Sequence, residues 1–350
     1  MKNRILFGII TVLILILIVL VLIASRTSPA TGSTTPSGST TVPATEPDST
    51  VPSTTTRPTE PPTVPPTEPP TEPPTVPPTE PPTEPPTEPP TTGPSIQYPD
   101  SWEGIGLYSR AELEALSNKK FPFGPGRTSG GKRPPYPEAD QAKYSQYGAN
   151  FIAPDNGKIY LTFDCGYEYT ATDVDGTTYR VTERILDVLK EKNVKAVFFI
   201  TMHYARSQQD LVQRMIDEGH IVGNHTNDHP VMPDISIDRM IYEVMSLHDY
   251  VAEHYGYQMH LFRPPTGAYS VQSLAVVQNL GYKNVHWSFA YADYDTNAQP
   301  EKEAAMQLVT GSAHSGAIYL LHAVSTTNAE ILGDAIDAFR LEGYEIDLFQ

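Results

Sequence analysis

The sequence predicts an α/β fold in which parallel strands form an open sheet or a barrel. Two observations support this prediction. From Lys158 to the end of the chain, β-type segments alternate with helical segments, as is typical of parallel sheets whose strands are joined by helices. Polar residues also follow the ends of several of these strands, at the edge where such folds bind their ligands.

The expected elements follow from hydrophobic patterning, and Ser207, Ser236 and Ser270 are the expected starts of three helices. The expected strands are Ile159–Phe163, Ala196–Thr201, Ile221–Gly223, Leu261–Arg263, Asn284–Trp287, Ala317–Leu321 and Tyr344–Asp347. The expected helices are Thr182–Lys192, Gln208–Glu218, Ile237–Tyr255, Val271–Leu280, Glu301–Val309 and Ala329–Leu341. The stretch Tyr169–Tyr179 lacks the ligand spacing of a calcium loop, so we interpret it as a surface insertion.

An apolar run lies near the start of the chain. Lys2 and Arg4 precede a largely apolar stretch from Ile5 to Ala24, which as a helix would span a hydrocarbon core of about 30 Å. No A-x-A type of cleavage site follows it. We therefore expect residues 1–28 to be a cytoplasmic stub and an uncleaved signal anchor, with the bulk of a single-pass cell-membrane protein outside the cytoplasm. A cleaved signal peptide is the alternative.

Residues 29–95 are rich in proline and threonine, and residues 59–90 consist of eight four-residue units, T-E-P-P or T-V-P-P. Proline supports neither the interior of a helix nor an inner strand, so this segment cannot build a core. We expect an extended linker, at about 3.1 Å per residue in the polyproline II conformation. Residues 96–157 are the expected N-terminal elaboration of a catalytic domain that covers residues 158–350.

The composition excludes some partners and some bonds. Lys and Arg number 24 against 41 Asp and Glu, and the formal net charge of -17 argues against a nucleic-acid partner. Cys165 is the single cysteine, so no intrachain disulfide can form. We expect a monomer.

The most informative segment is K-I-Y-L-T-F-D-C-G-Y-E, from Lys158 to Glu168. It predicts a buried strand that carries Asp164 at its C-terminal tip. A catalytic base would be useful at that tip, and a plain turn residue is the alternative interpretation.

Other motifs follow the later strands. G-N-H-T-N-D-H-P places His225 and His229 four residues apart, and on one helical turn their imidazoles would share the side on which a metal could bind. The remaining polar residues at strand ends are Arg263 and Thr266 in R-P-P-T-G, Asp293 with Tyr294, and His322 in L-L-H. Each of them alone could be an ordinary polar residue, but the joint set predicts an active site.

The ordered motifs T-F-D-C-G, H-T-N-D-H-P, R-P-P-T-G, Asp293-Tyr294 and L-L-H-A-V-S resemble those of the polysaccharide deacetylase family, also known as the NodB-homology or carbohydrate esterase family 4 domain. The resemblance covers about Lys158 to Leu348. The segments T-F-D-C-G-Y-E and G-A-I-Y-L-L-H-A-V-S-T-T-N-A-E are most similar to the delta-lactam-biosynthetic de-N-acetylase branch. That branch acts on N-acetylmuramic acid in peptidoglycan during spore cortex formation.

The resemblance implies a distorted (β/α) barrel of the NodB-homology type and a hydrolase that removes N-acetyl groups from amino sugars. It also implies a divalent metal, usually Zn²⁺, on His225 and His229, where it would activate a water molecule. Asp164 would take a proton from that water, and Arg263 would keep Asp164 ionised.

The same resemblance assigns roles on the opposite side of the site. The Thr266 N–H would bind the oxyanion, and His322, kept protonated by Asp293, would give its proton to the departing amine. Tyr294 stands where the family usually has tryptophan, so we expect one wall of the substrate groove to differ.

Cys165 is a second departure, because the family commonly has a metal-binding aspartate at this position. A thiolate is a good zinc ligand, so one interpretation is a site formed by Cys165, His225 and His229. The other interpretation is that Cys165 is a small spectator and that two histidines hold the metal.

The expected partner is a peptidoglycan glycan strand, with N-acetylmuramic acid as the first substrate candidate. N-acetylglucosamine in peptidoglycan, chitin oligomers and acetylxylan are rivals that require the same chemistry. A wall-binding module without catalysis is the alternative from another class. The presence of Asp164, Arg263, Asp293 and His322 favours an enzyme.

Overall fold

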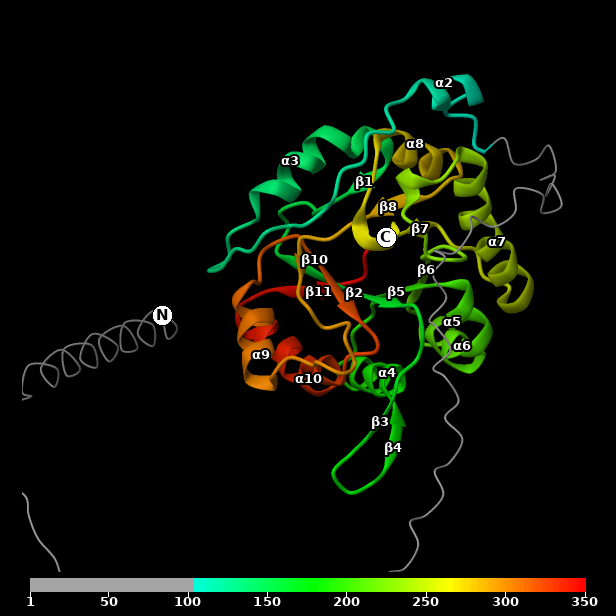
Figure 1. The fold of residues 1–350 in the computed structure, drawn as a ribbon. Helices are drawn as coiled ribbons and strands as arrows, with labels where there is room; N and C mark the ends of the chain where they lie inside the picture. Colours follow the sequence, from blue (N-terminus) through cyan, green and yellow to red (C-terminus); the bar gives the residue numbers. More distant parts are fainter. Residues whose placement is uncertain (1–103) are drawn as a thin grey trace, which may run out of the picture. The chain divides into compact units, whose positions relative to one another are not determined.

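The strand β2, Lys158–Cys165, pairs with three other strands of a nine-stranded sheet (Figure 1). The computed structural model describes residues 104–350. In these residues the strands of the large sheet follow the spatial order β1 (Ala149–Asn150), β8 (Lys283–Val285), β7 (Leu261–Phe262), β6 (Ile221–Asn224), β5 (Val197–Ile200), β2, β10 (Ala317–His322) and β9 (Phe289–Ala290). The ninth strand, β11 (Glu345–Asp347), pairs with the first residues of β2. Every pairing in this sheet is parallel.

The sheet is curled and open. Among the described strands, β1 and β9 each pair with one neighbour and not with each other, so the curl does not close. The prediction of a parallel α/β fold is therefore confirmed, and the predicted distorted barrel takes the form of a half-barrel. An open curl leaves the carboxyl ends of the central strands accessible from its inner side, where a substrate can enter.

The helices pack against the outer face of the curl, which is the more apolar face. Ile159, Leu161, Phe163 and Cys165 of β2 belong to this outer core, because alternate residues of a strand point to the same face. The helices that contribute to it are α2 (Arg110–Ala115), α4 (Val181–Glu191), α5 (Met202–Ser207), α6 (Gln209–Asp217), α7 (Ile237–Tyr255), α8 (Val271–Asn279), α9 (Lys302–Gly311) and α10 (Thr326–Leu341). The other residues of β2 face the inside of the curl, and Asp164 is one of them.

All seven predicted strands and all six predicted helices are present, with ends that differ by no more than a few residues. Ser236 and Ser270 cap α7 and α8 as predicted, since each side chain accepts a hydrogen bond from the first turn. The Ser207 prediction is wrong because Ser207 ends α5, a short helix that the sequence pattern did not indicate. Helix α10 begins three residues earlier than expected, because Ser325 caps it.

Residues 104–157 pack on the sheet and on α8. They include α2 (Arg110–Ala115), α3 (Pro135–Tyr144) and β1, which extends the sheet at its edge. Phe151 is fully buried in an aromatic cluster with Tyr144 and Tyr269. The Arg133 guanidinium donates hydrogen bonds to the carbonyl oxygens of Ser315 and Ala153. This segment thus shares core and hydrogen bonds with the rest of the unit.

The insertion predicted at Tyr169–Tyr179 is an antiparallel hairpin of β3 (Thr170–Thr172) and β4 (Thr178–Arg180), which projects beyond α4 in Figure 1. An ion pair between Arg184 of α4 and Asp173, the residue that follows β3, ties the hairpin to α4.

The predicted anchor at residues 1–28, the linker at residues 29–95 and the first residues of the elaboration lie outside the described residues. None of the helices between residues 104 and 350 combines the length and the apolar character of a membrane-spanning segment.

Candidate active site

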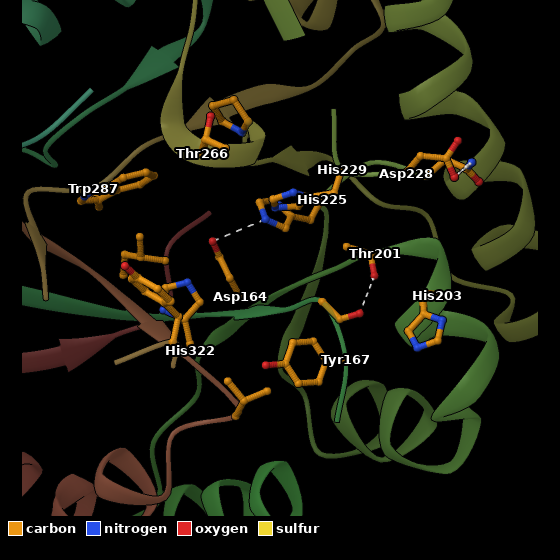
Figure 2. Close-up of a pocket in the computed structure, with 16 residues that line it drawn as sticks. Asp164, Tyr167, Thr201, His203, His225, Asp228, His229, Thr266, Trp287 and His322 are labelled. Carbon is orange, nitrogen blue, oxygen red and sulfur yellow. Dashed lines mark hydrogen bonds and ion pairs between the residues drawn. The ribbon is translucent and has the colours of Figure 1, made fainter. Parts of the chain in front are cut away.

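A pocket of about 890 Å³ opens at the carboxyl ends of the central strands (Figure 2). Its wall includes Asp164 near the end of β2, Thr201 after β5, His225 after β6, Thr266 after β7 and His322 at the end of β10. In a parallel sheet the carboxyl ends of all strands lie at one edge, so residues far apart in the sequence meet there. The structure therefore brings together four of the residues that the sequence singled out, and adds Thr201 to them.

Asp164 is buried and paired with a fully buried arginine. Nη1 of Arg263 donates to Oδ1 of Asp164 at 2.8 Å, and the guanidinium also donates to the carbonyl oxygens of Val285 and His286 at 3.1 Å each. Burial by itself would raise the pKa of Asp164, but the charge of Arg263, helped by two nearby histidines, lowers that pKa below its usual value. Asp164 is therefore ionised at neutral pH, with Oδ2 directed toward the pocket.

His225 and His229 lie side by side next to Asp164. Their ring centroids are 4.8 Å apart, and Nε2 of His225 is 3.6 Å from Oδ2 of Asp164. Nδ1 of His225 lies 2.9 Å from the carbonyl oxygen of Arg263, so this nitrogen carries a proton and donates it. Burial lowers the pKa of His225 to about 4, and partial removal from water lowers that of His229. At neutral pH both imidazoles are thus uncharged.

The two histidines do not share a helical turn, and in this respect the prediction is wrong. Residues 225–229 form a loop in which Thr226 and His229 have the left-handed φ values of 72° and 59°. The Thr226 hydroxyl accepts a hydrogen bond from the His229 N–H at 2.9 Å. This tight loop, rather than helix periodicity, brings the two imidazoles together.

Glu243 of α7 is a candidate that sequence reasoning missed. Its side chain is fully buried, and Oε2 accepts a hydrogen bond from the Asp228 N–H at 2.8 Å. Its main-chain oxygen accepts another from the Asn227 N–H at 3.0 Å. Arg239, one turn earlier on α7, contacts the carboxylates of both Asp228 and Glu243. Glu243 therefore ties the histidine loop to a long helix.

A sequence signal for Glu243 was available. It lies three residues after Met240 and four before Leu247, on the inward-facing stripe of α7. A charged residue in such a stripe indicates a buried polar partner, because glutamate is almost never fully buried without one.

His322 faces Asp164 from the neighbouring strand, and the two residues are direct partners in the register of β10 and β2. Nδ1 of His322 is 2.7 Å from Oδ1 of Asp293, whose Oδ2 accepts hydrogen bonds from the His322 N–H and the Asn328 amide. Burial acts to lower the pKa of His322, but the hydrogen bond and charge of Asp293 outweigh it, so the pKa is raised. His322 is a better proton carrier near neutral pH than an isolated histidine.

Thr266, Tyr294 and Trp287 line the rest of the pocket. Thr266 has a φ of 59°, and Gly267 packs so closely on Trp287 that a Cβ there would lie 2.4 Å from the indole. Tyr294 is 60% exposed and stands edge-on to His322, with ring centroids 5.7 Å apart. The sequence singled out Thr266 and Tyr294 but not Trp287, which was expected to be the last residue of the strand Asn284–Trp287. In the structure that strand ends at Val285, so Trp287 lies beyond it, at the pocket.

Cys165 is placed away from this group. Adjacent residues of a strand point to opposite faces, so the Cys165 side chain enters the outer apolar core while Asp164 faces the pocket. Burial raises the pKa of the thiol well above its ordinary value, so Cys165 is protonated at neutral pH. A thiolate ligand does not fit this placement, and the geometry supports the interpretation of Cys165 as a small buried spectator.

A divalent metal fits the two histidines in its donor chemistry. Between residues 104 and 350, no three His, Cys, Asp or Glu side chains are grouped closely enough to hold an ion by themselves. His225 and His229 nevertheless offer what such an ion needs: uncharged imidazoles, close together, at the pocket wall. The His225–Arg263 contact fixes the tautomer of one ring and leaves its Nε2 lone pair available.

The pocket thus holds an ionised carboxylate and a histidine with a raised pKa on adjacent strands. Two titratable groups with pKa values pushed apart are the arrangement that general acid–base catalysis uses. The fold and this pocket define an α/β enzyme with a general acid–base site at the strand ends.

Comparison with known proteins identifies the family. The family profile described as polysaccharide deacetylase matches residues 152–285. The peptidoglycan-N-acetylmuramic acid deacetylase PdaA of Bacillus subtilis is 38% identical over 236 residues, which are 67% of this chain and 86% of that protein. An uncharacterized 30.6 kDa protein of Geobacillus stearothermophilus is 42% identical over 202 residues, 57% of this chain and 72% of that protein.

Solved structures agree. The structure of Bacillus subtilis PdaA, a family 4 carbohydrate esterase, matches with a TM-score of 0.61 and 35% identity, over 67% of this chain and 96% of that one. A family 4 carbohydrate esterase from Bacillus anthracis matches with a TM-score of 0.53 and 34% identity, over the same shares. The chain belongs to the polysaccharide deacetylase family, and the resemblance predicted from its motifs is confirmed.

Proposed function

We propose that this enzyme removes the N-acetyl group from N-acetylmuramic acid in peptidoglycan, as a step toward delta-lactam formation. The observation that supports this reaction is that one pocket holds two groups suited to move protons. They are the carboxylate of Asp164, bound by Arg263, and the imidazole of His322, bound by Asp293. Support for the sugar comes from the relative at 38% identity whose name specifies N-acetylmuramic acid.

Asp164 acts as the general base. Its Oδ1 is occupied by Arg263, so Oδ2 is the atom that takes the proton from a water molecule attacking the acetamide carbon. Arg263 is fully buried and bound to two carbonyl oxygens, which fixes the direction of the carboxylate. The low pKa keeps Asp164 ready to accept the proton over the physiological range.

His322 acts as the general acid. Its Nδ1 is engaged by Asp293, so the proton that reaches the departing amine nitrogen comes from Nε2. The Thr266 N–H is the proposed donor to the oxyanion, a contribution of about 3 kcal/mol in enzymes where one such donor has been removed. Trp287 and Tyr294 form the walls against which the sugar ring lies.

His225 and His229 are the proposed ligands of a divalent metal ion, with Zn²⁺ as the first candidate. Bound there, the ion would supply Lewis acidity for the acetamide oxygen and lower the pKa of a water molecule. The two uncharged, adjacent imidazoles support this proposal.

The proposed location follows from the sequence. The apolar run at residues 5–24 would anchor the chain in the cell membrane, and the Pro/Thr-rich segment would carry a monomeric catalytic unit outside the cytoplasm toward the glycan strands.

The test is to incubate the purified enzyme with peptidoglycan and analyse the digested muropeptides by mass spectrometry. We expect muramic acid to lose the mass of one acetyl group, with release of acetate that a chelator suppresses and added Zn²⁺ restores. Asp164→Asn should abolish the release, with Asp175→Asn in the hairpin turn as the matched control. Loss of acetyl from glucosamine alone would overturn the sugar assignment. Absence of acetate release from any glycan would favour a binding module.

A further inference from the structure

A second cavity continues the active-site pocket. It has a volume of about 480 Å³ and shares three wall residues with the pocket: His203, Asn227 and Asp228. Figure 2 shows His203 and Asp228 at one end of the pocket, with Trp287 and His322 at the other end. A sugar in the pocket would therefore have its neighbour or its substituent in this side cavity, on the side of the histidine loop.

Arg206 gives the side cavity a positive charge. Among the described residues that line either cavity, it is the one arginine or lysine. It is exposed, and its guanidinium lies over the Tyr250 ring at 5.3 Å, which limits its rotamers. His203 lies three residues earlier on α5, so both side chains share one face of that helix.

Asp228 does not cancel this charge. Its carboxylate is bound by the Arg239 guanidinium on one oxygen and by the Asn227 amide on the other. Arg206 takes part in no ion pair within residues 104–350. An anion that enters the side cavity therefore meets an uncompensated guanidinium, which favours carboxylates through two parallel hydrogen bonds.

We propose that Arg206, assisted by His203, forms a subsite for a carboxylate carried by the glycan strand, and that this subsite makes the enzyme select acidic over neutral amino sugars. The inference rests on the proposed function, because muramic acid bears a lactyl carboxyl group that glucosamine lacks. Two sources share this chemistry: the free lactyl carboxylate of a muramic acid without its peptide, and a carboxylate of an attached stem peptide.

The test compares Arg206→Gln and Arg206→Lys with Arg127→Gln, a control that removes the same charge from an exposed residue at an unconnected cavity. Acetate release is measured on three substrates: glycan strands stripped of peptide, strands with stem peptides that keep their free carboxylates, and chitin oligomers. For Arg206→Gln we expect kcat/KM to fall about tenfold on the stripped strands, through KM, with no change on chitin oligomers. Arg206→Lys should keep most of the activity, and added salt should weaken the preference of the natural enzyme.

The outcomes separate the two proposals. If the natural enzyme acts on the strands but Arg206→Gln behaves like Arg127→Gln, the subsite is overturned and the proposed function stands. If Arg206→Gln loses equal activity on chitin oligomers, Arg206 does not read a carboxylate and the subsite is also overturned. If the natural enzyme deacetylates only chitin oligomers, both proposals fail. A defect on stripped strands but not on strands with stem peptides identifies the lactyl carboxylate as the group that is bound. A defect only on strands with stem peptides identifies a carboxylate of the peptide.

Discussion

Asp164 and Cys165 are neighbours in the sequence but lie on opposite faces of β2. One faces an aqueous pocket, and the other is packed in the apolar core. The chemistry of cysteine, a good zinc ligand, made both interpretations of Cys165 reasonable from the sequence. The period of two along a strand decides between them, because a side chain cannot reach the proposed metal site from the face that the helices cover.

The Asp293–His322 pair leads to a prediction about pH. In the proposed mechanism His322 must carry a proton to protonate the leaving amine, so activity is expected below its pKa and is lost as the pH rises through that value. Asp293 raises this pKa through a hydrogen bond and its charge. In Asp293→Asn the pKa falls, so the alkaline loss of kcat should begin at a lower pH, with kcat itself reduced by about 10²-fold or more.

The measurement is a pH profile of kcat for acetate release. Asp295→Asn, an exposed carboxylate two residues along the same loop, is the matched control and should leave the profile unchanged. An Asp293→Asn enzyme that folds, by circular dichroism, but keeps the alkaline limb of the natural enzyme would show that His322 is not the acid.

Among the structural elements, the loop of residues 225–229 is one whose conformation the sequence did not predict. The spacing of His225 and His229 predicted that they meet, and in the structure they do. The prediction of a shared helical turn failed because loop conformation depends on partners outside the loop. The N–H groups of Asn227 and Asp228, between the two left-handed residues, donate to Glu243 of α7, which is distant in the sequence. Strand and helix periodicity, by contrast, is local. It predicted seven strands and six helices that are present, although it missed the short helix α5.

Glu243 should therefore control the histidine pair without touching substrate. In Glu243→Ala the Asp228 N–H loses its acceptor, and the loop gains freedom. We expect the affinity for Zn²⁺ to fall about 10- to 100-fold, the range found when residues that orient metal ligands are removed. Titration calorimetry measures this affinity, and thermal unfolding measured in the absence of metal separates it from a general loss of stability.

Glu253→Gln, an exposed change on the same helix, is the control and should leave Zn²⁺ affinity as it is. Because Glu243 acts through the loop, added Zn²⁺ should restore part of the activity of Glu243→Ala. Equal Zn²⁺ affinity in Glu243→Ala and the natural enzyme would show that the loop holds its shape without this contact.

At the scale of the whole unit, the alternation of strands and helices from Lys158 onward predicted the parallel sheet, because each element buries an apolar face that its own sequence shows. Residues 104–157 were predicted to elaborate the catalytic domain, but the strand, core residues and hydrogen bonds that they add to it could not be predicted. The two-residue strand β1 is too short to leave a pattern, and Arg133 reaches its carbonyl partners only in the folded chain. The resemblance to the family begins at Lys158, whereas residues before it, such as Tyr144 and Phe151, already pack in one core with Tyr269.

The extent of this core predicts which fragments fold. A fragment of residues 104–350 keeps every described contact and should fold and release acetate. A fragment of residues 158–350 loses β1 and the fully buried Phe151, and exposes Tyr269 and Leu274. Burial of each such side chain contributes about 1.5–3 kcal/mol to the free energy of unfolding. The summed loss for these side chains is therefore comparable with the total stability of a domain, about 5–15 kcal/mol. We expect this shorter fragment to be unfolded or aggregated.

The point variant Phe151→Ala tests the same idea without truncation. It should lower the free energy of unfolding by about 3–5 kcal/mol, whereas Leu107→Ala, at a side chain that is 50% exposed, should change it by less than about 0.5 kcal/mol. Urea unfolding followed by circular dichroism gives both values. A folded and active 158–350 fragment, or a Phe151→Ala enzyme as stable as Leu107→Ala, would mean that the catalytic unit begins at β2 and that the preceding segment only covers it.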